Sequence, residues 1–220
     1  MWSRALRRTG QCLIVLGLVL LYFVAYLLWG TGRYTHHAQS QLRRDIVREF
    51  SLPADDPFRR LPAESPSPTP TPRTSGKPIA LLRIPKIGVE VVVAEGVSLE
   101  VLRGGPGHFP GTAMPGEIGN FVVSGHRTTY GAPFFNLNKL IAGDPVEVRS
   151  DTGYYEYRVT SLKVVRPDEI AVTYPVPYHR ETKPTKALLT LTTCEPRYSA
   201  ARRLVVFAEL ASGQTPTGKP

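Results

Sequence analysis

The chain contains the run LTLTTC at residues 189–194, which alternates leucine with β-branched threonine and ends in a thiol. β-branched residues favour extended backbone, and the next residues, 195–199, are polar and turn-forming. We therefore predict a strand over residues 187–193 with Cys194 at its reachable end. A thiol becomes a nucleophile when a nearby cation favours its thiolate. A buried structural cysteine is the alternative.

Two other strand ends supply partners for such a thiol. His126 directly follows the apolar run Phe121–Ser124, which fixes its backbone better than a loop would. Arg203 opens the apolar run Leu204–Phe207, where a guanidinium can stabilise an oxyanion. The neighbouring Arg202 should point to the opposite face of the strand. A capping histidine and a solvated arginine remain the alternatives.

The other histidines are weaker candidates for the base. His36 and His37 precede any folded domain, and His179 lies in a proline- and tyrosine-containing loop. His108 lies in the glycine-rich stretch 104–110, a predicted loop that would border a substrate groove. The sequence has no C-x-x-C or H-E-x-x-H pattern, so we infer no metal site.

The N-terminal region predicts a membrane anchor. Residues 12–29 carry no charge and as a helix would span about 27 Å, near the thickness of a bilayer core. Arginines at positions 4, 7 and 8 precede this run, so residues 1–11 should be cytoplasmic and the rest exported. A cleaved signal peptide is the alternative, but its apolar core is usually shorter, about 7–15 residues.

Cysteine count and charge restrict the partners. Cys12 would lie in the membrane and Cys194 outside it, so they cannot pair, and the exported one is a reactive thiol or makes an intermolecular bond. The formal net charge of +9 favours contact with anionic envelope polymers or lipid head groups, or it marks only a solvated surface. An exported domain without an aromatic-basic motif argues against nucleic acid.

The middle of the chain, residues 30–77, is predicted to be a stalk and linker. Residues 38–50 have apolar positions at helical spacing, which favours a short amphipathic helix. A solvated helix along the stalk is the favoured interpretation, and a membrane-surface or packing role is the alternative. Residues 53–78 are rich in proline and favour a polyproline II spacer that holds the domain away from the membrane. A folded domain is expected over 78–212 and a frayed tail over 213–220.

Short strands with Gly/Pro turns predict an all-β barrel or sandwich for this domain. A helical turn is expected at residues 99–102 with Ser98 as its N-cap. The expected strands cover residues 79–84, 89–93, 121–124, 146–149, 154–160, 187–193 and 203–210.

Over residues 79–210 the chain resembles the sortases, the membrane-anchored cysteine transpeptidases of Gram-positive bacteria. The resemblance rests on the family's TLxTC pattern at 190–194, on Gly125-His126, and on Arg203 at the start of the last strand. Residues 107–116 (GHFPGTAMPG) and 124–131 (SGHRTTYG) look most like the class E, housekeeping-type sortases of actinobacteria.

The resemblance implies an eight-stranded β-barrel with a groove for an extended sorting signal. Cys194 would attack the Thr–Gly bond of an LPXTG-like signal, or LAXTG in class E, to form a thioacyl enzyme. His126 would act as acid and base, and Arg203 would hold the substrate and its oxyanion. An amine of a lipid II-type cell-wall precursor, or a pilin lysine, would then resolve the intermediate.

The same resemblance suggests four substrate-binding residues and no cofactor or metal. Class E sequences often have tyrosine where this chain has Phe109, which leaves the preferred second residue of the signal open. The four suggested residues are Thr193, His108, Phe109 and Tyr130.

Three other functions stay open at this point. One is a pilin-polymerising sortase. Another is a different exported cysteine enzyme, such as an L,D-transpeptidase or a papain-like protease; the latter needs a helix starting at the thiol, which Thr192, Thr193 and Pro196 oppose. The third is a non-catalytic envelope scaffold in which Cys194 is structural.

Overall fold

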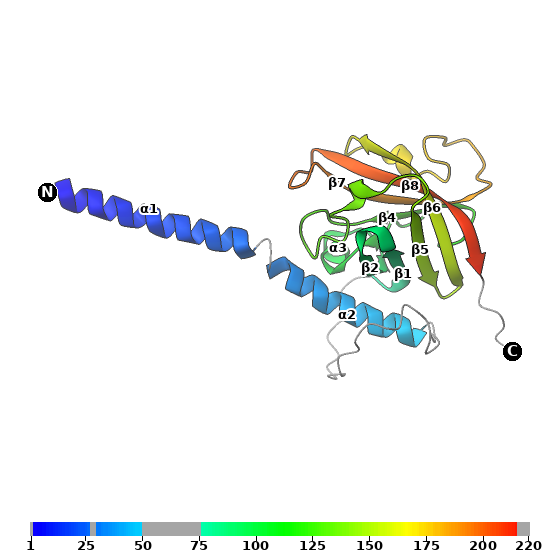
Figure 1. The fold of residues 1–220 in the computed structure, drawn as a ribbon, viewed down its shortest axis with the longest axis horizontal. Coiled ribbons are helices and arrows are strands. Elements are labelled where there is room, and N and C mark those ends of the chain that lie inside the picture. Colours follow the sequence, from blue (N-terminus) through cyan, green and yellow to red (C-terminus); the bar gives the residue numbers. More distant parts are fainter. Residues whose placement is uncertain (1, 27–29, 50–75, 215–220) are drawn as a thin grey trace.

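The structure, a computed structural model, describes residues 2–26, 30–49 and 76–214. Within these residues eight strands close into a barrel in the order β1-β2-β3-β4-β7-β8-β6-β5 (Figure 1). The predicted all-β barrel with short helices is thus confirmed. The strands are β1 (Pro78–Ile84), β2 (Val89–Glu95), β3 (Gly107–His108), β4 (Gly119–Ser124), β5 (Pro145–Ser150), β6 (Gly153–Val165), β7 (Ala187–Glu195) and β8 (Arg202–Gln214).

The core fills the barrel with the side chains that alternate inward. In β6, Tyr157 and Val159 are buried while Arg158 and Thr160 are exposed, as the alternating pattern predicted. In β7, Leu189 and Leu191 point into the same core. Because side chains alternate along a strand, Thr190, Thr192 and Cys194 point to the outer face of the barrel.

The connections follow the local sequence signals. Gly88 takes a left-handed conformation (φ 63°) after the 3-10 turn Pro85–Ile87, which lets β1 and β2 pair in antiparallel. The helix α3 (Leu99–Gly104) is capped as predicted, with the Ser98 side chain accepting a hydrogen bond from Val101 N.

Two of the predicted boundaries differ from the structure. Residues 107–108, expected to be part of a loop, form β3, which pairs with β2 on one side and β4 on the other. A strand of two residues is too short to leave a periodic pattern in sequence. β8 continues to Gln214, past the expected domain end at 212, because it pairs along β6 as far as Tyr154. Residues 215–220 lie outside the described residues.

The N-terminal helix α1 (Trp2–Ala25) contains the candidate membrane span. Its segment Arg7–Ala25 has a mean hydropathy of 1.8, and none of this segment is buried against the protein. In Figure 1 the helix extends away from the barrel. Residues 27–29 of the predicted span lie outside the described residues. The helix supports single-pass anchoring by length and composition.

The second helix, α2 (Thr31–Glu49), is longer than predicted and is packed on the barrel, which corrects the expectation of a solvated stalk. Ile46 is fully buried against Leu81 and Val92. The Gln39 amide accepts a hydrogen bond from Val92 N (2.7 Å) and donates one to Val92 O (3.1 Å). The side chain thus bonds both backbone groups of Val92, as a neighbouring strand would. The signal was present in the spacing of Leu42 and Ile46, but sequence alone does not show which surface an apolar helix face meets.

The proline-rich segment therefore has a different place in the molecule. Its residues 50–75 lie outside the described part, so their predicted polyproline II conformation is not tested. They join the end of α2 to the start of β1, and both of these elements lie on the barrel (Figure 1). The length of this segment consequently does not separate the domain from the membrane, contrary to the prediction.

Candidate active site

Three neighbouring strands carry the predicted catalytic residues at their ends. Cys194 on β7 pairs directly with Arg203 on β8, so their side chains share one face of the sheet. β4 runs parallel to β7 with Ser124 opposite Thr192, and Gly125 N donates to Thr192 O (3.1 Å). Continuing this register by two residues brings His126 level with Cys194. Cys194 is partly exposed.

Hydrogen bonds lock the two strand ends together at this point. Thr193 Oγ1, buried directly before Cys194, donates to Gly125 O (2.8 Å). The Arg127 guanidinium donates to Cys194 O (3.2 Å) and to a Glu195 carboxylate oxygen (2.9 Å). Arg127 is only 3% exposed, so this charge is compensated inside the protein. These bonds fix the backbone on both sides of the thiol.

The environment of His126 suits a proton-transfer residue. Its Nδ1 lies 3.4 Å from Thr129 Oγ1, at the long end of a hydrogen bond. Its Nε2 is buried and finds no hydrogen-bond partner among the residues that the structure describes. Burial, and then the nearby positive charge of Arg103, hold the pKa of His126 below the ordinary histidine value. A neutral ring with an uncommitted nitrogen can accept a proton.

His108 is the opposite case. It is 2% exposed, and both ring nitrogens are occupied, with Nδ1 2.6 Å from Glu95 Oε2 and Nε2 2.8 Å from Thr112 Oγ1. Its ring also packs against Phe121 at 5.2 Å between centroids. A histidine held in this way joins β3 to the loop that follows it. The suggested substrate contact of His108 therefore finds no support in its position.

The strand register places Arg202 and Arg203, which follow Cys194 in the chain, on opposite faces of the sheet. Arg202 pairs with Glu195 and is exposed, as expected for the opposite face. The Arg203 guanidinium donates to Ala200 O (3.0 Å) and Arg202 O (3.1 Å), which holds it toward the β7–β8 turn. Arg197 stacks over the ring of Phe135 at 4.1 Å and has a structural position.

The two aromatic candidates flank this region differently. Tyr130 lies beside the predicted base, with 4.9 Å between its ring centroid and that of His126. Phe109, directly after β3, is 38% exposed. Gly125 has no space for a side chain, because a Cβ there would lie 2.7 Å from the ring of Phe134. Because Gly125 has no side chain, the Phe134 ring can pack against the backbone directly before His126.

The outer face of β7 and β8 continues from the thiol under the β6–β7 loop, residues 166–186. Asn120 on β4 holds this loop, since its amide donates to Val172 O and Tyr174 O (3.0 Å each). Thr190 Oγ1 in turn donates to Asn120 Oδ1 at 2.7 Å. All of these contacts connect the loop to the strands that carry His126 and Cys194.

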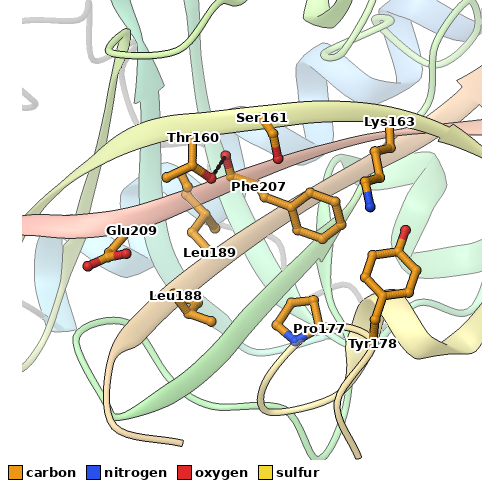
Figure 2. A pocket seen from close by; sticks show the side chains of 10 residues that line it. Thr160, Ser161, Lys163, Pro177, Tyr178, Leu188, Leu189, Phe207 and Glu209 are labelled. Atoms are coloured by element: carbon orange, nitrogen blue, oxygen red, sulfur yellow. Dashed lines mark hydrogen bonds between the residues drawn. The ribbon is translucent and has the colours of Figure 1, made fainter.

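A pocket of about 220 Å³ lies further along the same face. Figure 2 shows Phe207 and Tyr178 lining it, with Lys163 above the ring of Tyr178 at 4.4 Å. Phe207 pairs with Thr190, four residues before the thiol, which is about 13 Å along the strand. Cys194 and the Leu188 wall of this pocket thus lie on the same face of β7, with the buried Thr190 between them.

Two residues of the site were not singled out from the sequence. The only sequence feature that marked Arg127 was its position after His126. Its sequence context does not distinguish it from the other arginines until its partners are known. Asn120 left a clearer signal, because it is a polar residue within the otherwise apolar strand that ends before His126. A buried polar side chain in such a run must find partners. No group of three metal-binding side chains occurs among the described residues.

The sequence around this site matches a known family over residues 82–211, described as the Sortase domain. The chain belongs to the sortase family. It is 34% identical over 225 residues to sortase SrtE1 of Streptomyces coelicolor, an alignment that covers 98% of this chain and 60% of that protein. The chain thus spans less than two thirds of SrtE1. SrtE2 of the same organism is 28% identical over 216 residues, covering 94% of this chain and 83% of that protein.

Solved sortase structures share the barrel. Sortase E1 from Streptomyces coelicolor, solved with a tripeptide in its active site, has a TM-score of 0.59 and 38% identity, covering 65% of this sortase and 94% of that chain. Sortase E from Streptomyces avermitilis has a TM-score of 0.58 and 41% identity, covering 67% and 97%. These similarities agree with the class E likeness of the motifs.

Proposed function

We propose that this sortase is a membrane-anchored cysteine transpeptidase that cleaves an LPXTG- or LAXTG-like sorting signal between threonine and glycine. The observation that supports it most is the common face of Cys194 and Arg203. The register of β4 with β7 leads to His126 two residues beyond its last pair, and His126 Nε2 is uncommitted. Thiol, base and cation on adjacent strand ends are what acyl transfer requires.

The proposed reaction has two acyl transfers. Cys194 Sγ attacks the threonine carbonyl carbon as His126 Nε2 takes the thiol proton, and the oxyanion faces the Arg203 guanidinium. The C–N bond then breaks, and His126 returns the proton to the glycine amine, which leaves a thioester on Cys194. An amine of a cell-wall precursor attacks the thioester, passes its proton to His126, and releases the thiol.

We further propose that α1 spans the cell membrane with the N-terminus in the cytoplasm and the barrel outside. The support is the apolar helix and the arginines that precede it. Protease added to intact, wall-stripped cells should then degrade the barrel. A barrel that stays fully protected until the membrane is permeabilised would contradict this orientation.

The activity is tested with the full chain in detergent micelles, a fluorogenic LAXTG peptide and an amine acceptor. Wild type should cleave between threonine and glycine and show a thioacyl adduct on Cys194 by mass spectrometry. Cys194→Ala should lose both signals. If it still cleaves at this bond, the proposed mechanism is wrong. If wild type neither reacts with the peptide nor with a thiol alkylating agent, the scaffold function is favoured.

A further inference from the structure

The first two turns of α2 contact the loop that carries His126 and also the end of α3, whose Arg103 lies near Tyr130. Tyr130 N donates to Thr31 Oγ1 at 3.3 Å, and Thr35 Oγ1 donates to Arg103 O at 2.9 Å. Both threonines are almost completely buried, at 9% and 6% exposure. The Thr35 methyl group also lies against Gly131, where an added Cβ would be 3.2 Å away. We call these contacts of Thr31 and Thr35 the helix–loop contact.

The residues held by this contact are the ones that surround His126. Tyr130 packs on the His126 ring at 4.9 Å with an interplanar angle of 40°. The Arg103 guanidinium lies 5.9 Å from the centre of the Tyr130 ring. A non-glycine residue with φ of 51°, Tyr130 needs such external support to keep its conformation. α2 therefore holds in place the residues that pack around His126.

The rest of α2 is attached to the barrel independently of this loop. Gln39 bonds the β2 backbone, the Arg43 guanidinium pairs with Glu90 at 2.9 Å, and Ile46 is buried against β1 and β2. The helix is therefore a rigid support against which the loop can be held. A change at Thr31 or Thr35 alters the loop without detaching the helix.

We propose that α2, which lies between the candidate membrane span and the barrel, is a positioning element of the active site that orients His126 through Tyr130. This inference rests on the proposed role of His126 in acyl transfer. The helix–loop contact sets the ring angle and the burial of His126. Loss of the contact should weaken proton transfer more than substrate binding.

The test uses the isosteric double variant Thr31→Val/Thr35→Val of the full chain in micelles. Valine keeps the shape of threonine and removes only the two hydroxyls. Ser40→Ala is the matched control, because its hydroxyl is exposed and bonds only within α2, to His36 O and His37 O. The three measurements are thermal unfolding, kcat and KM for the peptide, and the titration of His126 by NMR.

The double variant should lower kcat by about tenfold with little change in KM, since small errors in orientation act on the chemical step. The pKa of His126 should rise toward its ordinary value, because the loop that buries the ring is loosened. Arg103 acts on the pKa of His126 and Tyr130 packs on its ring, and neither is changed in the double variant. Cys194 and Arg203, on the ends of the neighbouring strands, are unchanged as well. Ser40→Ala should match wild type in every measurement.

An unchanged kcat and an unchanged His126 titration in a folded double variant would overturn the proposal. If the double variant unfolds, Thr31→Val alone decides, since its hydroxyl contacts the Tyr130 amide directly. If wild type lacks transpeptidase activity, the proposed function fails, and the titration still shows whether α2 positions the histidine. Loss of kcat in Ser40→Ala as well would indicate a general effect of α2 stability.

Discussion

At the scale of single residues, the two histidines near β3 and β4 differ in what their ring nitrogens contact. His126 Nε2 has no partner among the described residues, whereas His108 is bonded at both nitrogens. His126→Ala should therefore lower kcat by at least about 10²-fold, the usual effect of losing a positioned acid or base. Kinetics with peptide and amine acceptor measure this.

His108→Ala makes the matched comparison. It should reduce the melting temperature, because it removes the hydrogen bonds of the buried ring to the Glu95 carboxylate and the Thr112 hydroxyl, yet retain most of kcat in the folded protein. If His108→Ala proved inactive and His126→Ala active, our assignment of the base would be wrong.

The lowered pKa of His126 predicts the pH dependence of kcat/KM. The free enzyme needs the neutral ring to accept the thiol proton, so activity is lost when His126 is protonated. Because burial and Arg103 keep its pKa below the ordinary value, the acid limb should have its midpoint below about pH 6.5. Tyr130→Ala, which exposes the ring, should shift this limb to higher pH. A wild-type midpoint above pH 7 would contradict the expectation.

The arginine pair offers a test of strand register. Arg203 shares the face of Cys194, and Arg202 shares the face of Glu195. Since a planar guanidinium differs from a point charge, Arg203→Lys should lower kcat/KM strongly while thermal unfolding stays the same. Arg202→Lys should have little effect. Sensitivity at Arg202 instead would mean that the register in solution differs by one residue.

At the scale of elements, a buried side chain, Asn120, bonds the β6–β7 loop to the barrel. Asn120→Ala removes two hydrogen bonds to this loop and the partner of Thr190. The free energy of unfolding should fall by about 1–3 kcal/mol, the cost of unpaired buried groups. If the signal binds under this loop, KM should rise more than kcat falls.

Thr173→Ala is the control for this variant, because its hydroxyl is exposed and bonds only to Ile170 O in the same loop. Denaturant unfolding and peptide kinetics on both variants separate loop anchoring from a general loss of stability. Equal effects of Asn120→Ala and Thr173→Ala would show that Asn120 has no special role.

At the scale of the whole molecule, the active site lies near the candidate membrane span. α1 ends at Ala25, and Thr31 already contacts the loop beside His126. Six residue steps reach at most about 21 Å, so the site stays close to the end of α1. A sorting signal with an apolar tail in the bilayer would present its cleavage point in this zone.

This geometry predicts different effects for two insertions of the same flexible sequence. About 20 Gly/Ser residues between Gly30 and Thr31 add about 25 Å of coil and should reduce anchoring of membrane-borne substrates in cells, with soluble-peptide kinetics unchanged. The same insertion near residue 66, in the segment that joins α2 to β1, should leave both unchanged. Equal loss of anchoring from both insertions would contradict the docked position of α2.

Much of the candidate site could be predicted from the sequence because its signals are local. Alternation of leucine and threonine before Cys194, the apolar runs at His126 and Arg203, and the uncharged N-terminal stretch each follow from side-chain chemistry over a few residues. That Cys194, His126 and Arg203 lie at neighbouring strand ends could be expected from the barrel of the family that the sequence resembles. The contact partners of Arg127 could not be predicted, because they lie up to 68 residues away.

The sequence by itself therefore determined seven of the eight strands, the candidate span and the choice of the three central residues as candidates, since period, charge and residue type act locally. Only the tertiary structure decided that His108 is bonded at both nitrogens and that α2 lies on the barrel beside Tyr130. These depend on which surfaces meet across long separations in the chain. A helix with an apolar face indicates that something must cover it, and the fold alone determines what does.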